Sequence, residues 1–138
     1  ECQVLMMRLE TDLLEIINST IENKLNNIKI KWSKKKSITI VLCAKGYPSQ
    51  YLKDSEIKNL SNILTDKENQ IFHAGTYKKN DKVYSSGGRV LNITSSSESL
   101  LDARNKSLNN ISKINWTDGF FRKDIGWKVL NTYEDHSR

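Results

Sequence analysis

The sequence predicts an α+β fold in which a long N-terminal helix precedes a small, mainly antiparallel β domain with one packed helix. Apolar residues recur every three to four positions over Val4–Asn27, which is typical of an amphipathic helix. Two β-branched and apolar runs, Ser37–Ala44 and Arg89–Thr94, are typical of strands. A second apolar stretch with helical spacing starts at Leu100. Strands and helices in this order favour an antiparallel sheet with a helix on it.

Composition excludes several classes of protein. The chain has 138 residues, of which 37% are hydrophobic and 28% charged, as expected for one globular domain rather than for a disordered chain. No apolar run approaches the roughly 18 residues of a membrane-spanning helix, so we expect no membrane partner. Cys2 and Cys43 match no metal-ligand spacing, and we expect both thiols to be free in a reducing cytoplasm.

The net charge of +6, densest at Lys34–Lys36, is compatible with a nucleic-acid partner or with an anionic ligand. Heavy use of Lys, Asn and Ile also arises from an AT-rich genome. No arginine-rich helix or basic strand with interleaved aromatic residues is present, so we expect no nucleic-acid partner. A non-catalytic basic module that binds anions or nucleic acid remains the alternative function.

Each element follows from its local pattern. A polar, basic stretch, Asn26–Lys36, is predicted to join the N-terminal helix to the first strand. That strand is predicted to end at Lys45-Gly46-Tyr47-Pro48, because Gly and Pro interrupt strands. Residues 57–64 fit either a helical turn or a loop. A second strand, Gln70–Ala74, is predicted to form a hairpin with Lys82–Ser85 through a turn at Asn80-Asp81.

The second helix is predicted to begin at Ser95, with Glu98 completing a capping box. Its apolar face continues to Ile114. Four large residues are predicted to anchor the following tail: Phe120, Phe121, Ile125 and Trp127. The last residues, Glu134–Arg138, are predicted to be frayed.

The segment Ser86-Gly87-Gly88-Arg89 is a candidate anion site. Two glycines allow backbone N–H groups to approach a ligand closely, and an arginine supplies a planar cationic fork that suits phosphate. A tight hairpin or bulge with Arg89 in solvent explains the same residues.

Lys45-Gly46-Tyr47-Pro48 is a second candidate, because loops that follow buried strands often bind ligands. Lys45 can pair with an anion, and Tyr47 can stack or donate a hydrogen bond; a structural turn is the alternative. His73, in the second strand, fits a general base or a packed, hydrogen-bonded residue.

Several segments resemble the glycinamide ribonucleotide synthetase (phosphoribosylamine–glycine ligase) family, and they follow the family's order. Glu1–Leu9 is similar to the helix that follows the family's Arg-Phe-Gly-Asp-Pro-Glu motif. Lys45–Pro48 resembles its Lys-Gly-Tyr-Pro-Gly loop, with Ser49 in place of the last glycine. Three further segments resemble its Phe-His-Ala-Gly-Thr strand, its Ser-Gly-Gly-Arg-Val-Leu segment and its closing Arg-Arg-Asp-Ile-Gly: Phe72–Thr76, Ser86–Leu91 and Arg122–Gly126.

The resemblance implies an ATP-dependent ligase of purine biosynthesis that joins 5-phosphoribosylamine to glycine, giving glycinamide ribonucleotide, ADP and phosphate. The family belongs to the ATP-grasp superfamily, and its Mg²⁺ or Mn²⁺ ligands precede the position that matches Glu1. We therefore expect no catalytic or metal-binding residue in this chain, no activity from it alone, and partnership with the upstream portion of the same enzyme. A cytoplasmic monomer is expected.

The resemblance also divides the chain. Residues 1–32 would be the last helix of the ATP-grasp core with its linker. Residues 33–138 would be the family's C-terminal domain, similar to barrel-sandwich hybrids. In that domain Arg89 and the amides of Gly87 and Gly88 would clamp the substrate's 5-phosphate, and the loop of Lys45, Gly46, Tyr47 and Pro48 would line the same site.

Overall fold

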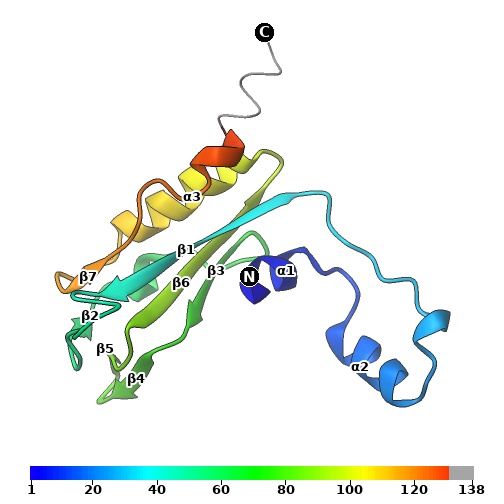
Figure 1. Ribbon diagram of the computed structural model, residues 1–138, viewed down its shortest axis with the longest axis horizontal. Helices are drawn as coiled ribbons and strands as arrows, with labels where there is room; N and C mark the ends of the chain where they lie inside the picture. The colour runs from blue at the N-terminus through cyan, green and yellow to red at the C-terminus, as the bar shows by residue number, and fades with distance from the viewer. Residues whose placement is uncertain (131–138) are drawn as a thin grey trace, which may run out of the picture.

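The computed structural model, which describes residues 1–130, is an α+β structure with two antiparallel sheets. The larger sheet has the order β3-β6-β1-β7 and the smaller one β2-β5-β4. Helix α3 lies on one face of the larger sheet and α1 on the other, while α2 stands away from both sheets (Figure 1). The α+β class with antiparallel sheets is confirmed. Among residues 1–130, no helix is long and apolar enough to cross a membrane.

Strands β1 (Lys36–Ala44) and β6 (Arg89–Ser97) form the centre of the larger sheet. They pair along their whole lengths, from Lys36 opposite Ser97 to Leu42 opposite Leu91, and a bulge then places Cys43 opposite Arg89. Alternate residues of β1 are buried, as a strand with one face on a core requires. The edge strands are β3 (Asn69–His73) and β7 (Gly119–Phe120).

The smaller sheet contains the hairpin, but with a different first strand from the one predicted. Strands β4 (Thr76–Lys79) and β5 (Lys82–Ser85) form it through Asn80 and Asp81, both of which have positive φ. Strand β3 instead pairs with β6, because the chain leaves the larger sheet after His73. The ambiguous region forms the short β2 (Glu56–Ile57) and a 3₁₀ turn, Leu60–Asn62.

Helix α3 (Leu100–Ser112) begins four residues later than predicted. Its N-cap is Ser99, whose Oγ accepts a hydrogen bond from the Asp102 amide at 3.0 Å. Ser95 fits the same capping pattern, but pairing with β1 keeps the chain extended to Ser97. Within residues 1–130, the helix packs on a core of ten buried residues and contributes Ile111 to it: Ile40, Leu42, Ala44, Ile57, Ile63, Val90, Leu91, Ile93, Ile111 and Trp116.

The prediction of a single N-terminal helix, which rests on the periodicity, is wrong. Two short helices are present, α1 (Cys2–Arg8) and α2 (Leu13–Ile21), followed by a 3₁₀ turn at Leu25–Asn27. Between them the chain is extended, since Leu9 forms a bridge with Trp32. Asp12 then caps α2 by accepting from the amides of residues 14 and 15. The apolar spacing continues across this break and hides it.

Two of the four predicted tail anchors are confirmed. Phe121 and Ile125 pack against the core, whereas Phe120 and Trp127 remain 42% and 47% exposed. The tail is held instead through its backbone, because Arg104 of α3 donates hydrogen bonds to the carbonyls of Lys123 and Ile125. The predicted frayed end lies outside the described residues.

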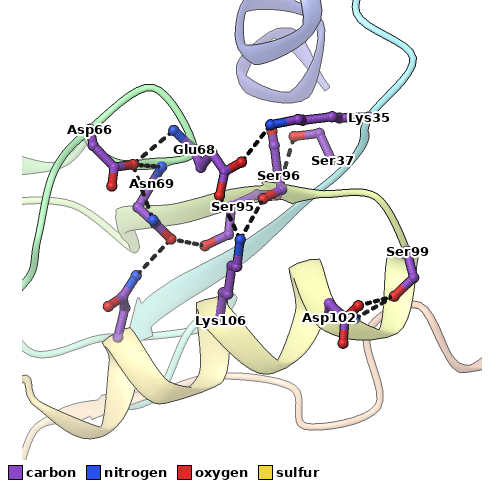
Figure 2. Close-up of polar contacts among 11 residues, drawn as sticks. Lys35, Ser37, Asp66, Glu68, Asn69, Ser95, Ser96, Ser99, Asp102 and Lys106 are labelled. Carbon is purple, nitrogen blue, oxygen red and sulfur yellow. Dashed lines mark hydrogen bonds and ion pairs between the residues drawn. The ribbon is translucent and has the colours of Figure 1, made fainter.

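Glu68, which precedes β3, connects the start of β1 and helix α3 through ion pairs (Figure 2). Its carboxylate accepts from Lys106 of α3 at 2.6 Å and from Lys35, just before β1, at 2.5 Å. These two lysines lower the pKa of Glu68 from 4.5 to about 2, the contact with Lys106 contributing most. The amide of Glu68 likewise lowers the pKa of Asp66, whose carboxylate caps the turn before β3.

We expect the Glu68 contacts to make stability fall between about pH 4.5 and pH 2. Because the folded-state pKa is depressed, their contribution is complete above the unfolded value and is lost as pH falls through the folded one. Urea unfolding from pH 6 to pH 2 should show a smaller loss for Glu68→Gln than for the parent chain. Asp81→Asn, which removes a carboxylate paired with Lys78 in open solvent, should keep the parent's slope. A parallel loss in Glu68→Gln and the parent would contradict this.

Candidate functional site

The two loops that the sequence singles out lie side by side at one end of the larger sheet. The first follows β1 and the second precedes β6, and these strands are antiparallel neighbours. The Ala44 amide donates to the Gly88 carbonyl at 2.8 Å, which joins the loops directly. The aromatic ring of Tyr47 lies against Gly88, where an added Cβ would come within 2.2 Å of it. Both candidate segments therefore belong to one site.

The loop after β1 is a tight, internally bonded turn. Gly46 has φ +97°, and a Cβ there would lie 2.0 Å from the Gln50 carbonyl oxygen, so glycine is required. The amide of Tyr47 donates to Ala44 at 3.0 Å, and the Tyr47–Pro48 peptide bond is cis. The Lys45 amide donates to the Asp118 carbonyl at 2.8 Å, which anchors the loop to the segment before β7. Lys45 itself is exposed.

Gly87 and Gly88 pack closely against other residues of the protein. The Gly87 amide donates to the Gly75 carbonyl at 3.3 Å, and Gly88 is buried beneath Tyr47. Gly75 and Gly87 pack backbone against backbone, because a Cβ on Gly75 would lie 2.6 Å from the Gly87 Cα. The glycines thus bring three chain segments together, and the Gly87 amide is already bonded inside the fold.

Arg89 is the exposed cation of this second loop. It lies opposite Cys43 across the β1–β6 ladder, so the two side chains share one face of the sheet. Burial raises the pKa of the Cys43 thiol, and the positive charge of Arg89 partly opposes that rise. Arg89 and Lys45 thus present two exposed cations at the same end of the sheet.

A pocket of about 320 Å³ lies beside the Tyr47 loop. One wall is the outer face of β1 with Cys43, and another is Tyr47 and Pro48. The sequence reasoning missed the third wall, formed by residues 120–122 and Ile125. The Arg122–Gly126 motif was the available signal, but only the pairing of β7 with β1 brings that segment here. Small-ligand sites are typically apolar hollows of this kind with a few polar groups.

Of the residues in the two candidate loops, Tyr47 and Pro48 line this pocket, whereas Arg89 and Lys45 do not. The other candidate residues also lie outside it. His73 is exposed, and its Nδ1 lies 3.0 Å from the Thr76 hydroxyl. The basic run is divided, since Lys35 pairs with Glu68 while Lys36 borders a different groove beside α1. In the described part of the chain, no three His, Cys, Asp or Glu side chains gather where they could hold a metal ion.

Comparison with known proteins identifies relatives of this chain. A family model described as phosphoribosylglycinamide synthetase, C domain, matches residues 37–128. A phosphoribosylamine–glycine ligase from Brucella melitensis is 38% identical over 130 residues, covering 94% of this chain and 30% of that protein. The chloroplastic phosphoribosylamine–glycine ligase of Arabidopsis thaliana is 41% identical over 132 residues, covering 94% of this chain and 25% of that protein.

A crystal structure of phosphoribosylamine–glycine ligase from Thermotoga maritima shares the fold, with a TM-score of 0.60 and 28% identity over 79% of this chain and 27% of that one. The chain spans at most 30% of the length of these relatives. Residues 37–128 include both loops, their strands and the pocket. The chain therefore belongs to the phosphoribosylglycinamide synthetase C-domain family.

Proposed function

We propose that this chain is the C-terminal portion of a phosphoribosylamine–glycine ligase, and that it binds the phosphorylated sugar substrate. One observation carries the proposal: the family's two loops converge at one end of the sheet and present Arg89 and Lys45 to solvent. Arginine suits phosphate because its planar fork donates two hydrogen bonds at once. Relatives that carry this name support the reaction.

The geometry supports distinct roles for the loop residues. Arg89 and Lys45 would contact the 5-phosphate with their side chains. Gly46, Tyr47 and Pro48 would shape the first loop. Gly87 and Gly88 would hold the second loop in place, because Gly87 packs against Gly75 and Gly88 packs against Tyr47. Binding of this kind positions the substrate amine for attack on the activated glycine, which is chiefly an entropic contribution to the rate.

ATP and its Mg²⁺ or Mn²⁺ would be bound by the upstream portion of the ligase. Residues 1–32 would form the connection to that portion. Helix α2 supports this, since none of its residues is buried and the apolar Leu14 and Ile21 are 64% and 73% exposed. Such an uncovered apolar face is expected to meet another surface. A monomeric ligase in the cytoplasm completes the proposal.

A fusion tests the proposed function. This chain would replace the matching segment of the Brucella melitensis ligase, and ADP release would be measured with phosphoribosylamine, glycine, ATP and magnesium. We expect activity that needs both substrates, and none from this chain alone or from the truncated relative. A fusion that melts cooperatively and binds ATP yet releases no ADP above the truncated control would overturn the proposal.

A further inference from the structure

We infer that Arg122 is a third cation of the sugar-phosphate site, oriented by Asp124 and held in place through Arg104. The inference deepens the proposed function and rests on it. It assigns a role to the closing Arg122–Gly126 segment, which neither candidate loop includes.

The position of Arg122 is the first observation. Arg122 lines the same pocket as Tyr47, Pro48 and Cys43. Because Cys43 lies opposite Arg89, the two arginines flank one stretch of the outer face of β1. Arg122 and Cys43 line the pocket and Arg89 does not, and the pocket walls are mostly aromatic and aliphatic. Such a site suits a sugar ring, whose C–H face packs on apolar side chains while its phosphate reaches the cations.

The second observation is the orientation of the guanidinium. Arg122 donates from Nε to Oδ1 of Asp124 at 3.1 Å and from Nη2 to Oδ2 at 2.7 Å. This two-pronged contact fixes the plane of the guanidinium and uses two of its five N–H donors. The side chains of Arg122 and Asp124 are 69% and 50% exposed, so the remaining donors stay accessible to a ligand.

Folding stability does not account for this pair. Exposed ion pairs between neighbouring residues contribute little to stability, since solvent screens them and ordering long side chains costs entropy. An anion site gives a stronger reason, because a preorganised arginine loses less freedom when phosphate binds.

Arg104 is the positioning residue. From the half-buried surface of α3 it donates Nε to the Ile125 carbonyl at 2.9 Å and Nη2 to the Lys123 carbonyl. These two carbonyls stand on either side of Asp124 in the chain. Arg104 therefore holds the segment 122–125, which contains both Arg122 and Asp124, against helix α3.

Steady-state kinetics of the fusion enzyme test the inference. Arg122→Gln should raise the KM for phosphoribosylamine about 10-fold, while the KM for ATP stays unchanged. Arg104→Lys, which can reach only one of the two carbonyls, should raise the same KM about 3-fold. Lys123→Gln removes one positive charge from the same segment and should change neither constant.

Asp124→Asn separates orientation from charge. If Arg122 acted only through its charge, removing the neighbouring carboxylate would strengthen anion binding and lower the KM for phosphoribosylamine. Loss of the two-pronged contact should instead raise it about 3-fold. A lower KM in Asp124→Asn would overturn the orienting role.

The outcomes also separate this inference from the proposed function. If Arg89→Gln raises the KM for phosphoribosylamine and Arg122→Gln does not, the inference fails and the proposed function stands. If neither variant raises it, both fail. Equal increases in the KM for phosphoribosylamine and ATP in Arg122→Gln would show a structural role, and would overturn the inference.

Discussion

Gly75→Ala is expected to destabilise this chain by about 3 kcal/mol, because the added methyl group meets only backbone atoms. A Cβ at this position would lie 2.6 Å from the Gly87 Cα, 2.7 Å from the Gly87 nitrogen and 2.8 Å from the Arg89 carbonyl oxygen. No rotamer change relieves contacts of this kind. The chain must move apart where β3 passes into β4 and where β5 passes into β6.

Urea unfolding of the chain, followed by tryptophan fluorescence, measures this cost. Gly87→Ala is the matched control, since its Cβ would meet the Gly75 Cα at 3.1 Å and the Arg89 oxygen at 3.6 Å. We expect that variant to lose about 1 kcal/mol. Equal losses in the two variants, or no loss in Gly75→Ala, would show that the two glycines do not pack as described.

Gly75→Ala should also change the candidate site. The Gly75 amide donates to the Arg89 carbonyl at 3.0 Å, and its carbonyl accepts from Ser86 at 2.8 Å. Separating these strands therefore displaces Arg89 together with the loop that Tyr47 covers. The glycines of the candidate site thus hold its segments together, whereas the cations beside them are the groups that we propose to bind phosphate.

The central strands were predictable because their own residues determine them. The β-branched and apolar runs of residues 37–44 and around Ile93 mark β1 and β6 in the sequence, although only alternate residues of β1 are buried. The ends of elements were less predictable. Ser95 and Ser99 both head a capping pattern, and only the long-range pairing of β6 with Lys36 decides between them. At the N-terminus, Asp12 followed by Glu15 was a capping signal that the continuous apolar spacing concealed.

The candidate site was likewise predictable in part. The two loops could be found from their residue types, since glycine, proline and an adjacent cation are local signals. Their contact could not, because it depends on which strands are neighbours and on the bulge that places Cys43 opposite Arg89. The role of each glycine depends on the folded structure, since a Gly-Gly pair in the sequence fits backbone packing and ligand approach equally well. Arg122 was visible as part of a motif, but its position in the pocket follows from β7.

Arg89→Gln in the fusion enzyme is expected to raise the KM for phosphoribosylamine by about 10- to 100-fold, with little change in the KM for ATP or glycine. Charged hydrogen bonds contribute about 1.5–3 kcal/mol each, and the glutamine amide can replace neither the charge nor the fork. Arg89 is exposed at the start of β6, so the melting temperature should remain that of the parent. The KM for phosphoribosylamine in Arg89→Lys should lie between those of the parent and Arg89→Gln, since lysine keeps the charge and loses the paired donors.

A control is needed because the chain carries a net charge of +6, and any lost cation weakens the attraction of anions over long distances. Lys82→Gln removes one positive charge from the smaller sheet, where Lys82 pairs with Glu56 at 3.3 Å. That variant should leave the KM for phosphoribosylamine within about two-fold of the parent at 0.15 M salt, because exposed charges beyond about 8 Å are screened. Equal increases in Lys82→Gln and Arg89→Gln would mean that diffuse charge, and not contact with Arg89, draws the phosphate to this end of the sheet.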